Sequence, residues 1–271
     1  MYRLQSLAVL LCAALLCSCD LFGGDHGLRD ITAPIPSARI KFHNFSPSSV
    51  GVNFFANDQK MTAVLTSACT KPTTAADSLA CSTTGKESAT GVNYGGVASG
   101  GRYDAIAPGQ YTLAAKPAAK DNVVASVSET IADGKYYSFF MSGIYNATAS
   151  TADAFVVEDP IPAGPVDYTV AYVRLVNAVS NGTDNLNLYV TNTETSAESA
   201  VGGAVAYKAA GAFVTVPAGT YTLAVRYTGS STNLISRTAV SFLGGSVYTI
   251  TARGSTVTSS TLGLDYTENQ R

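Results

Sequence analysis

Residues 217–224 read PAGTYTLA, and residues 108–114 read PGQYTLA. In both stretches the Pro and Gly residues favour a tight turn, because Pro fixes one backbone angle and Gly tolerates unusual ones. The Tyr-Thr-Leu-Ala that follows has the residue types of a strand that begins at the turn. The repetition of this turn and strand indicates that the chain contains the same β-structure twice.

Two further pairs of segments support a duplication. Residues 133–139 (DGKYYSF) match residues 244–250 (GGSVYTI), and residues 38–44 (ARIKFHN) match residues 172–178 (YVRLVNA). The two opening segments alternate apolar with polar residues, which is typical of a half-buried strand. Matched positions of the turn-and-strand pair and of the DGKYYSF pair lie 110 or 111 residues apart. This constant separation predicts duplicated domains.

The rest of the chain also favours β-structure. It is rich in Thr, Ser, Val, Ala, Tyr and Gly, and turn signals recur about every ten residues. We predict an all-β protein with two tandem immunoglobulin-like antiparallel β-sandwich domains, residues 37–159 and 168–271, because each strand has one apolar face to bury. A closed barrel of the same strands is the alternative. Residues 160–167 contain three Pro residues and predict a stiff, extended connector.

These motifs resemble the bacterial domain of unknown function 4397, DUF4397. The resemblance rests on the strand 38–44 with Ser46-Pro47 after it, on the Pro-Gly-x-Tyr-Thr-Leu turn, and on Gly-Lys-Tyr-Tyr at residues 134–137. It covers residues 37–160 and 168–267, which is most of the chain. Domains of this family often occur in tandem in secreted or anchored proteins. The resemblance implies no established activity and no site residues.

The second copy departs from the first at its opening. Asn177-Ala178 stands where the first copy has His43-Asn44, and no Ser-Pro follows. Its turn, PAGTYTL at residues 217–223, is closer to the usual pattern of the family than the turn of the first copy.

The N-terminus has the pattern of a secretory leader. Arg3 precedes an uncharged apolar run from Leu7 to Leu16, which ends in Leu16-Cys17-Ser18-Cys19. This ending resembles the lipobox of bacterial lipoproteins, and the resemblance implies removal of residues 1–18 and acylation of Cys19. At about 1.5 Å per residue, the run is too short to span roughly 30 Å of hydrocarbon. An ordinary signal peptide cut elsewhere, which would leave Cys19 as a thiol, is the alternative.

A lipidated Cys19 would hold the protein at a membrane. Each buried CH₂ contributes about 0.8 kcal/mol, so two or three chains anchor a protein almost permanently. We expect a lipid-anchored protein of the bacterial cell envelope that faces the periplasm or the cell exterior. Residues 19–36 include Gly23-Gly24 and Pro34 and predict a flexible tether. Asp20 resembles an inner-membrane retention signal of some proteobacteria, and the choice of membrane stays open.

Charged residues are scarce, at 13% of the chain. Without residues 1–18, 16 basic and 19 acidic side chains remain, a net charge of about −3. Nucleic-acid binding depends on many cations that neutralise phosphates, so we predict no nucleic-acid partner. The acids Asp133, Glu158, Asp159 and Asp184 lie in turns or beside the connector, where a solvated charge is expected.

Two cysteines remain in the body of the chain, Cys69 and Cys81. In an oxidising compartment this pair predicts a disulfide, and closing such a loop stabilises a fold by roughly 3 kcal/mol in the chain-entropy model. A redox pair is the alternative, although the close C-x-x-C spacing is missing, and a Cys-based zinc site would need a second pair. Between the cysteines, Asp77-Ser78-Leu79 is similar to the O-glycan acceptor triplet of Bacteroidota.

Candidate catalytic and metal-binding residues are few. His26 lies in the predicted tether and His43 in an alternating strand, where a structural role is expected. No G-x-S-x-G accompanies His43 to complete a Ser-His-Asp hydrolase. Residues 181–185 (NGTDN) are the best calcium-loop candidate, but their single carboxylate and their spacing favour a hairpin turn. We therefore assign no catalytic, cofactor-binding or metal-binding residue and expect no cofactor.

Three functions are open from the sequence. The leading hypothesis is a non-enzymatic, membrane-anchored envelope lipoprotein with a structural, adhesive or partner-binding role, whose partner is an envelope protein or a glycan. A glycan-binding module is the alternative and needs exposed tyrosines, whereas Tyr111 and Tyr221 are expected to pack with their hydroxyls bonded to backbone. A cryptic hydrolase is the second alternative and needs two facing carboxylates about 5–10 Å apart.

Overall fold

The computed structural model describes residues 37–57, 59–62, 68–70, 80–82, 90–118 and 120–270, with the backbone alone in 68–70, in 80–82 and at Gln270. The predicted leader and tether with Cys19, and the triplet Asp77-Ser78-Leu79, lie outside the described residues and stay predictions. Within the described part of the chain, no helix is long and apolar enough to cross a bilayer.

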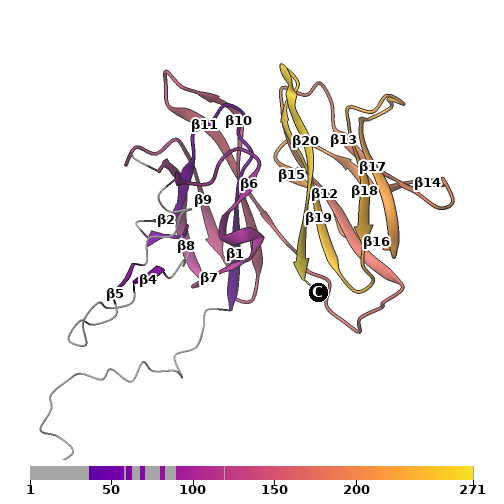
Figure 1. Cartoon of the computed structure of the whole chain (residues 1–271), viewed down its shortest axis with the longest axis horizontal. Helices are drawn as coiled ribbons and strands as arrows, with labels where there is room; N and C mark the ends of the chain where they lie inside the picture. Colours follow the sequence, from indigo (N-terminus) through magenta and orange to yellow (C-terminus); the bar gives the residue numbers. More distant parts are fainter. Residues whose placement is uncertain are drawn as a thin grey trace, which may run out of the picture. The chain divides into compact units, whose positions relative to one another are not determined.

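The first half of the described chain forms two sheets (Figure 1). One sheet has the order β11-β10-β1-β6, with β7 also paired to β1; its strands are β1 (Ala38–Asn44), β6 (Gly96–Val97), β7 (Asp104–Ile106), β10 (Tyr136–Asn146) and β11 (Thr151–Glu158). The other has the order β3-β2-β8-β9; its strands are β2 (Val52–Ala56), β3 (Gln59–Lys60), β8 (Gly109–Pro117) and β9 (Ala125–Ile131). The 3₁₀ turn η1 (Ala98–Gly101) joins β6 to β7.

The second half repeats this plan. One sheet has the order β15-β12-β19-β20, with β16 also paired to β12; its strands are β12 (Val170–Ser180), β15 (Ala209–Ala210), β16 (Val214–Pro217), β19 (Val247–Ser255) and β20 (Thr258–Gln270). The other has the order β14-β13-β17-β18; its strands are β13 (Leu186–Asn192), β14 (Glu198–Val205), β17 (Gly219–Tyr227) and β18 (Ile235–Phe242).

The predicted all-β class with sandwich-like domains is confirmed, with one feature that the sequence did not predict. In each half the first strand pairs in parallel with the penultimate one, β1 with β10 and β12 with β19, while the other named pairs are antiparallel. A parallel pair needs a long crossover instead of a short turn, so no local turn signal marks it.

The structure also corrects the match between the opening strands. The alternating pattern matched residues 38–44 with residues 172–178. In the structure the Asn44 amide donates to the Val92 carbonyl at 2.8 Å, and the Asn177 amide donates to the Val205 carbonyl at 3.0 Å. These two side chains hold equivalent turns, so residues 38–44 correspond to 171–177. The match made from sequence was shifted by one residue, which set the apolar Ile40 against Arg174 instead of Val173.

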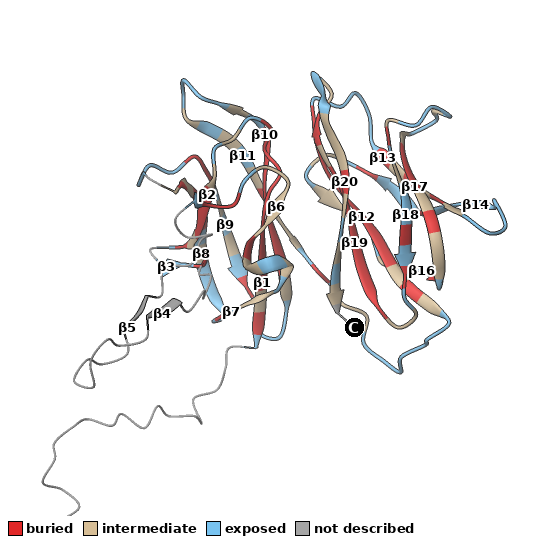
Figure 2. Ribbon diagram, in the orientation of Figure 1, coloured by how far each residue is buried: buried red, intermediate tan, exposed pale blue. Residues whose placement is uncertain are grey.

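Figure 2 shows long buried stretches in β1, β10, β12 and β19, and each half encloses a core of its own. Phe42 of β1, Phe54 of β2 and Phe139 of β10 are fully buried in the first core, with ring centroids 5.2–5.7 Å apart. Leu188 of β13 and Ile250 of β19 belong to a separate buried cluster in the second half. Two sheets with one apolar face each therefore bury those faces against one another in both halves.

Tyr221, in the repeated turn, packs as expected. Its ring is buried beside Phe242, at 5.5 Å between centroids, and its hydroxyl donates to the Pro217 carbonyl at 2.9 Å. Tyr111, at the matching position of the first half, is only partly buried against its core.

We expect Tyr221→Phe to lower the free energy of unfolding by about 1 kcal/mol, because a buried hydrogen bond is lost while the ring is kept. Chemical denaturation of the purified protein measures this change. Tyr111→Phe is the matched control and should have a smaller effect, since water can reach that position. Equal losses in the two variants would contradict the role given to the Tyr221 hydroxyl.

Residues from Pro36 to Arg271 form one compact unit in spite of the two cores. A third buried cluster joins Phe45, Phe140 and Phe155 of the first half with Val176 and Ala178 of the second. The Pro-rich connector therefore does not keep the two sandwiches apart. The boundaries 37–159, 160–167 and 168–271 stay predictions, because the structure groups these residues together.

Candidate functional site

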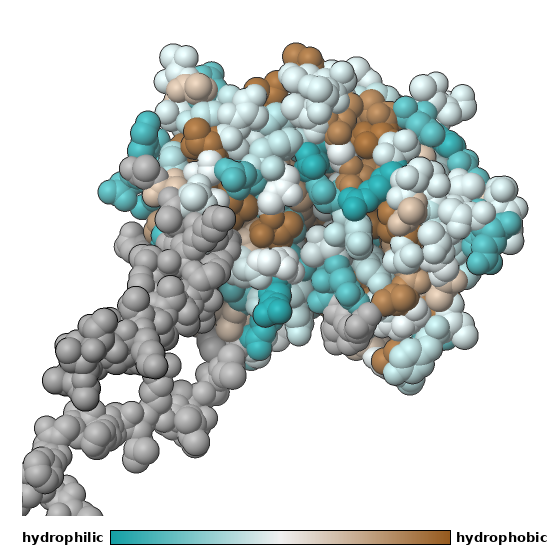
Figure 3. Space-filling view, in the orientation of Figure 1, coloured by the Kyte–Doolittle hydropathy of each residue, from teal (hydrophilic) through white to brown (hydrophobic). Residues whose placement is uncertain are grey.

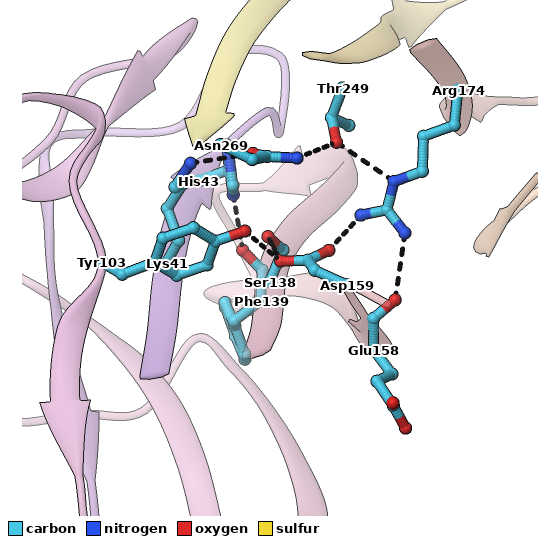
Figure 4. Close-up of polar contacts among 10 residues, drawn as sticks. All are labelled: Lys41, His43, Tyr103, Ser138, Phe139, Glu158, Asp159, Arg174, Thr249 and Asn269. Carbon is cyan, nitrogen blue, oxygen red and sulfur yellow. Dashed lines mark hydrogen bonds and ion pairs between the residues drawn. The ribbon is translucent and has the colours of Figure 1, made fainter. Parts of the chain in front are cut away.

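The sandwich faces that meet carry charged side chains. Along β1, Ile40 and Phe42 point into the core, so Lys41 and His43 lie on the opposite face of the sheet. On an isolated sandwich that face would be in water. Instead Lys41, His43 and Arg174 of β12 are only 1–2% exposed. The buried polar cluster around them, shown in Figure 4, is the most distinctive chemistry among the described residues.

Arg174 lies at the centre of this cluster. Its guanidinium forms a buried ion pair with the carboxylate of Asp159. It also donates to the Glu158 carbonyl and to the Thr249 hydroxyl, both at 3.0 Å. A buried charge is tolerated only when it is paired and hydrogen-bonded, and here one cation satisfies groups of both sandwiches. The expectation that Asp159 is a solvated acid is therefore wrong, because its carboxylate is 0% exposed.

The second oxygen of Asp159 accepts two hydrogen bonds. The Ser138 and Tyr103 hydroxyls both donate to it at 2.7 Å. Burial raises the pKa of Tyr103, and the neighbouring negative charge of Asp159 raises it further. The phenol therefore stays protonated and remains a donor, so Asp159 is held by one cation and two hydroxyls.

The buried charge of Lys41 is less well compensated than that of Arg174. Its ammonium donates to the side-chain oxygen of Asn269 at 3.0 Å and lies 4.1 Å from the centroid of the Tyr103 ring. Asn269 in turn donates to the Thr249 hydroxyl at 2.6 Å. Burial lowers the pKa of Lys41 to about 8, although the charge of Asp159 opposes this shift. An amide oxygen compensates a buried ammonium less well than a carboxylate would.

This lowered pKa predicts a dependence of stability on alkaline pH. The ordinary pKa of a lysine side chain is 10.5, so between pH 8 and 10.5 the unfolded chain binds the Lys41 proton while the folded protein has lost it. Stability must then rise with pH across this window, by on the order of 3 kcal/mol. Denaturant unfolding at several pH values measures the slope. Lys41→Met is the control, and an unchanged slope in that variant would refute the assignment.

His43 lies in the apolar part of the same contact. Its ring stacks on Phe140 at 4.3 Å between centroids, and Nδ1 lies 3.1 Å from the Phe139 carbonyl, which requires Nδ1 to carry the hydrogen. Burial lowers the pKa of His43 to about 3, and the charge of Lys41 adds to this effect. The imidazole is therefore neutral at physiological pH and packs as an aromatic ring.

Clefts near this contact contain few free acids. A cleft of about 420 Å³ lies beside β10 and β11, and its lining includes one carboxylate, Asp153, which pairs with Lys208 at 3.2 Å. A cleft of about 480 Å³ along the connector includes Glu158 and Asp159. Glu158 pairs with Lys135 at 2.8 Å, and Asp159 pairs with Arg174. Neither cleft presents two free, facing carboxylates among the residues that the structure describes.

The two cysteines of the predicted disulfide lie in a separate two-stranded sheet. Cys69 of β4 (Ala68–Thr70) is directly opposite Cys81 of β5 (Ala80–Ser82) in an antiparallel pair. Directly opposite residues have Cα atoms roughly 4.5–5.5 Å apart, a separation that a disulfide can bridge. The disulfide itself stays a prediction.

Residues 181–185 form a turn between β12 and β13, and Asn181 has a φ of 60° there. The Asp184 carboxylate accepts a hydrogen bond from the backbone N–H of Asn185 at 2.7 Å. Within the described ranges, no group of three or more His, Cys, Asp or Glu side chains could hold a metal ion.

Residues 171–271 match the family model of a domain of unknown function, DUF4397. The second sandwich is a DUF4397-like domain. Its match begins in β12, which carries Arg174, and ends beyond β20, which carries Asn269. The DUF4397-like domain therefore supplies one whole side of the buried polar cluster. No curated protein matches the chain.

Two solved structures resemble the chain weakly. The Bacillus anthracis TIE protein is 12% identical over 80% of this chain, with a TM-score of 0.22, and the chain spans 33% of its length. A candidate cell adhesion protein from Bacteroides ovatus ATCC 8483 is also 12% identical, over 87% of this chain and 98% of that one, with a TM-score of 0.22. At this TM-score neither likeness bears on the fold or the function.

Proposed function

We propose that this protein is a non-enzymatic, membrane-anchored lipoprotein of the bacterial cell envelope with a structural, adhesive or partner-binding role. One observation carries the proposal. Four charged and hydroxyl groups of the contact, those of Arg174, Asp159, Ser138 and Tyr103, are bonded in one network that joins the two sandwiches. Chemistry that could serve a reaction is thus used to join two β-domains into one body.

The surface also fits a role in binding a partner. On the face shown in Figure 3, apolar side chains form small separate patches in a mostly polar surface. Tyr168 is 76% exposed and Tyr266 is 45% exposed. These two rings keep the glycan-binding alternative open, since exposed tyrosines can stack on sugars.

Binding to the envelope tests the role directly. Labelled protein lacking the leader and Cys19 should bind saturably to isolated envelope fragments from the source cells. Treatment of the fragments with protease or with glycosidases then separates the two partner classes, and Tyr168→Ala and Tyr266→Ala test whether these exposed rings contact the partner. Absence of saturable binding to envelope protein or glycan fractions would overturn the proposal.

The anchor makes a separate prediction. Cys19→Ala should move the protein from the membrane fraction to the soluble fraction, because the thiol that carries the lipid is lost. Intact-mass analysis of the wild-type protein should show the added acyl chains on Cys19. Cys17→Ala is the matched control, since residue 17 would leave with the leader. A membrane-bound Cys19→Ala protein would contradict the lipid anchor.

A further inference from the structure

The strand registers relate the two halves residue by residue. Arg39 of β1 is opposite Tyr136 of β10, and Tyr172 of β12 is opposite Val247 of β19. Lys41 therefore corresponds to Arg174, and Ser138 corresponds to Thr249. In the last strand of each half, Glu158 is opposite Tyr137 and Glu268 is opposite Tyr248. Asp159 and Asn269 each follow these glutamates, and the register shifts at Asn269 because Val247 is opposite Gln270. We take Asp159 and Asn269 as counterparts because they are hydrogen-bonded to the equivalent residues Ser138 and Thr249.

Contacts between the halves are reciprocal in these terms. Arg174 of the second half binds Asp159 of the first, and Lys41 of the first half binds Asn269 of the second. Each last-strand residue is also hydrogen-bonded within its own half, Asp159 to Ser138 and Asn269 to Thr249. In an isologous interface each contact occurs twice, the second time with the two partners exchanged. The contacts of Arg174 with Asp159 and of Lys41 with Asn269 are related in this way.

The aromatic rings beside Lys41 and Arg174 are also equivalent in the two halves. Lys41 lies 4.1 Å from the ring centroid of Tyr103, and Arg174 lies 4.6 Å from that of Phe213. Ile40 is opposite Asp104 in the first half, and Val173 is opposite Val214 in the second. The residues just before these partners, Tyr103 and Phe213, are therefore counterparts.

The ends of the contact repeat the pattern with different residues. Tyr94 donates to the Thr261 carbonyl across the contact, and its counterpart Tyr207 donates to Asp153 across the contact at 3.1 Å. A cation lies over each ring, with Arg253 at 4.7 Å from the Tyr94 centroid and Lys208 at 5.4 Å from the Tyr207 centroid. Both ends thus combine a tyrosine with a cation.

Apolar residues at the middle of the contact have diverged instead. His43, Phe45 and Phe140 of the first half are large and fully buried. Their counterparts in the second half are small: Val176, Ala178 and Thr251. The Thr251 hydroxyl is buried without a hydrogen-bond partner among the described residues. Large side chains on one face therefore fit small ones on the other, and total volume is kept.

We infer that the two sandwiches form an internal pseudo-two-fold pair, equivalent to a dimer whose two subunits are fused in one chain. The polar contacts around the interface are still symmetric. The residues at its centre now differ in size between the halves and complement one another. The partner that this face fits is thus the unlike half and not a copy of itself. Two first-half faces would bring large rings together, and two second-half faces would leave a gap, so like pairing is disfavoured.

Cutting the connector tests the pairing. A protease site inserted between Ala163 and Gly164, which are both exposed, allows cleavage of the folded protein lacking its leader. Native mass spectrometry of the cleaved sample should then show pairs of unlike fragments. Separated fragments would overturn the interface, and like-with-like pairs at equal abundance would overturn the complementarity.

Exchange across the pseudo-two-fold axis tests the symmetry. Phe140→Thr should weaken association of the cleaved halves by leaving a gap, and Thr251→Phe should weaken it by overpacking. In the double variant the large side chain moves to the equivalent position, so association should recover at least tenfold over the weaker single variant. A double variant as weak as the two losses combined would overturn the symmetry.

A charge substitution tests the symmetric polar contacts without a change in side-chain volume. Asn269→Asp supplies the carboxylate that Asp159 provides at the equivalent position, and it should tighten association of the cleaved halves about tenfold through Lys41. Asn185→Asp, at an exposed turn of the same half, is the matched control for net charge. An equal effect of both substitutions, or weaker association with Asn269→Asp, would overturn the correspondence.

Discussion

Arg174→Met should lower the free energy of unfolding by about 3–5 kcal/mol, because it leaves the buried Asp159 carboxylate without a cation. The side chains of both partners are at most 1% exposed. The Ser138 and Tyr103 hydroxyls would still donate to the carboxylate, and the bonds of Arg174 to Glu158 and Thr249 would be lost. Since small domains are stable by about 5–15 kcal/mol, this is a large fraction of the total.

Denaturant unfolding of single and double variants measures this effect. Arg174→Met combined with Asp159→Asn should recover much of the loss, because no uncompensated charge then remains in the contact. The Arg226–Glu198 pair is the matched control, with side chains 15% and 39% exposed. Arg226→Met should cost less than about 1 kcal/mol. Equal costs for Arg174→Met and Arg226→Met would show that burial does not govern the ion pair.

Acid should destabilise the protein through His43. The pKa of His43 in the folded protein is about 3, against an ordinary value of 6.5 for a histidine in water. Between these values the unfolded chain takes up a proton that the folded protein does not, so stability falls as the pH falls. The loss approaches about 1.4 kcal/mol per pH unit, or on the order of 4–5 kcal/mol over the window.

A pH series of unfolding experiments on three proteins checks this assignment. His43→Phe should reduce the acid slope by close to one proton, since Phe can stack on Phe140 without titrating. His26→Gln is the matched control, because the other histidine of the chain is predicted to lie in the tether. If His26→Gln changed the slope as much as His43→Phe, the burial of His43 could not be its cause.

Local patterns were enough to predict the strands and their duplication. Alternation in residues 38–44 places Ile40 and Phe42 on one face, and the structure buries both in the first core. The Pro and Gly residues of the repeated turn mark where β8 and β17 begin. Both signals depend on neighbours in the sequence, and for this reason they can be found without knowledge of the fold.

The candidate site could not be predicted in the same way. Lys41 and Arg174 alternate with core residues, which is also the pattern of a charge that faces water. Asp159 beside a Pro-rich connector had the features of a solvated acid. Asn269 carries no signal of its own. A comparison of the two repeats at the correct register would have shown a cation at both positions 41 and 174, but a shift of one residue concealed it.

The sequence by itself determined that this chain forms β-sandwiches twice over, since strand periodicity and turn chemistry act over a few residues. Only the tertiary structure decided that the outer faces of two sheets become a second interior. That outcome depends on contacts between residues more than 100 positions apart, such as Lys41 with Asn269. Burial there converts an ordinary lysine, histidine and aspartate into the groups that govern stability, because removing water makes each charge costly unless a partner meets it.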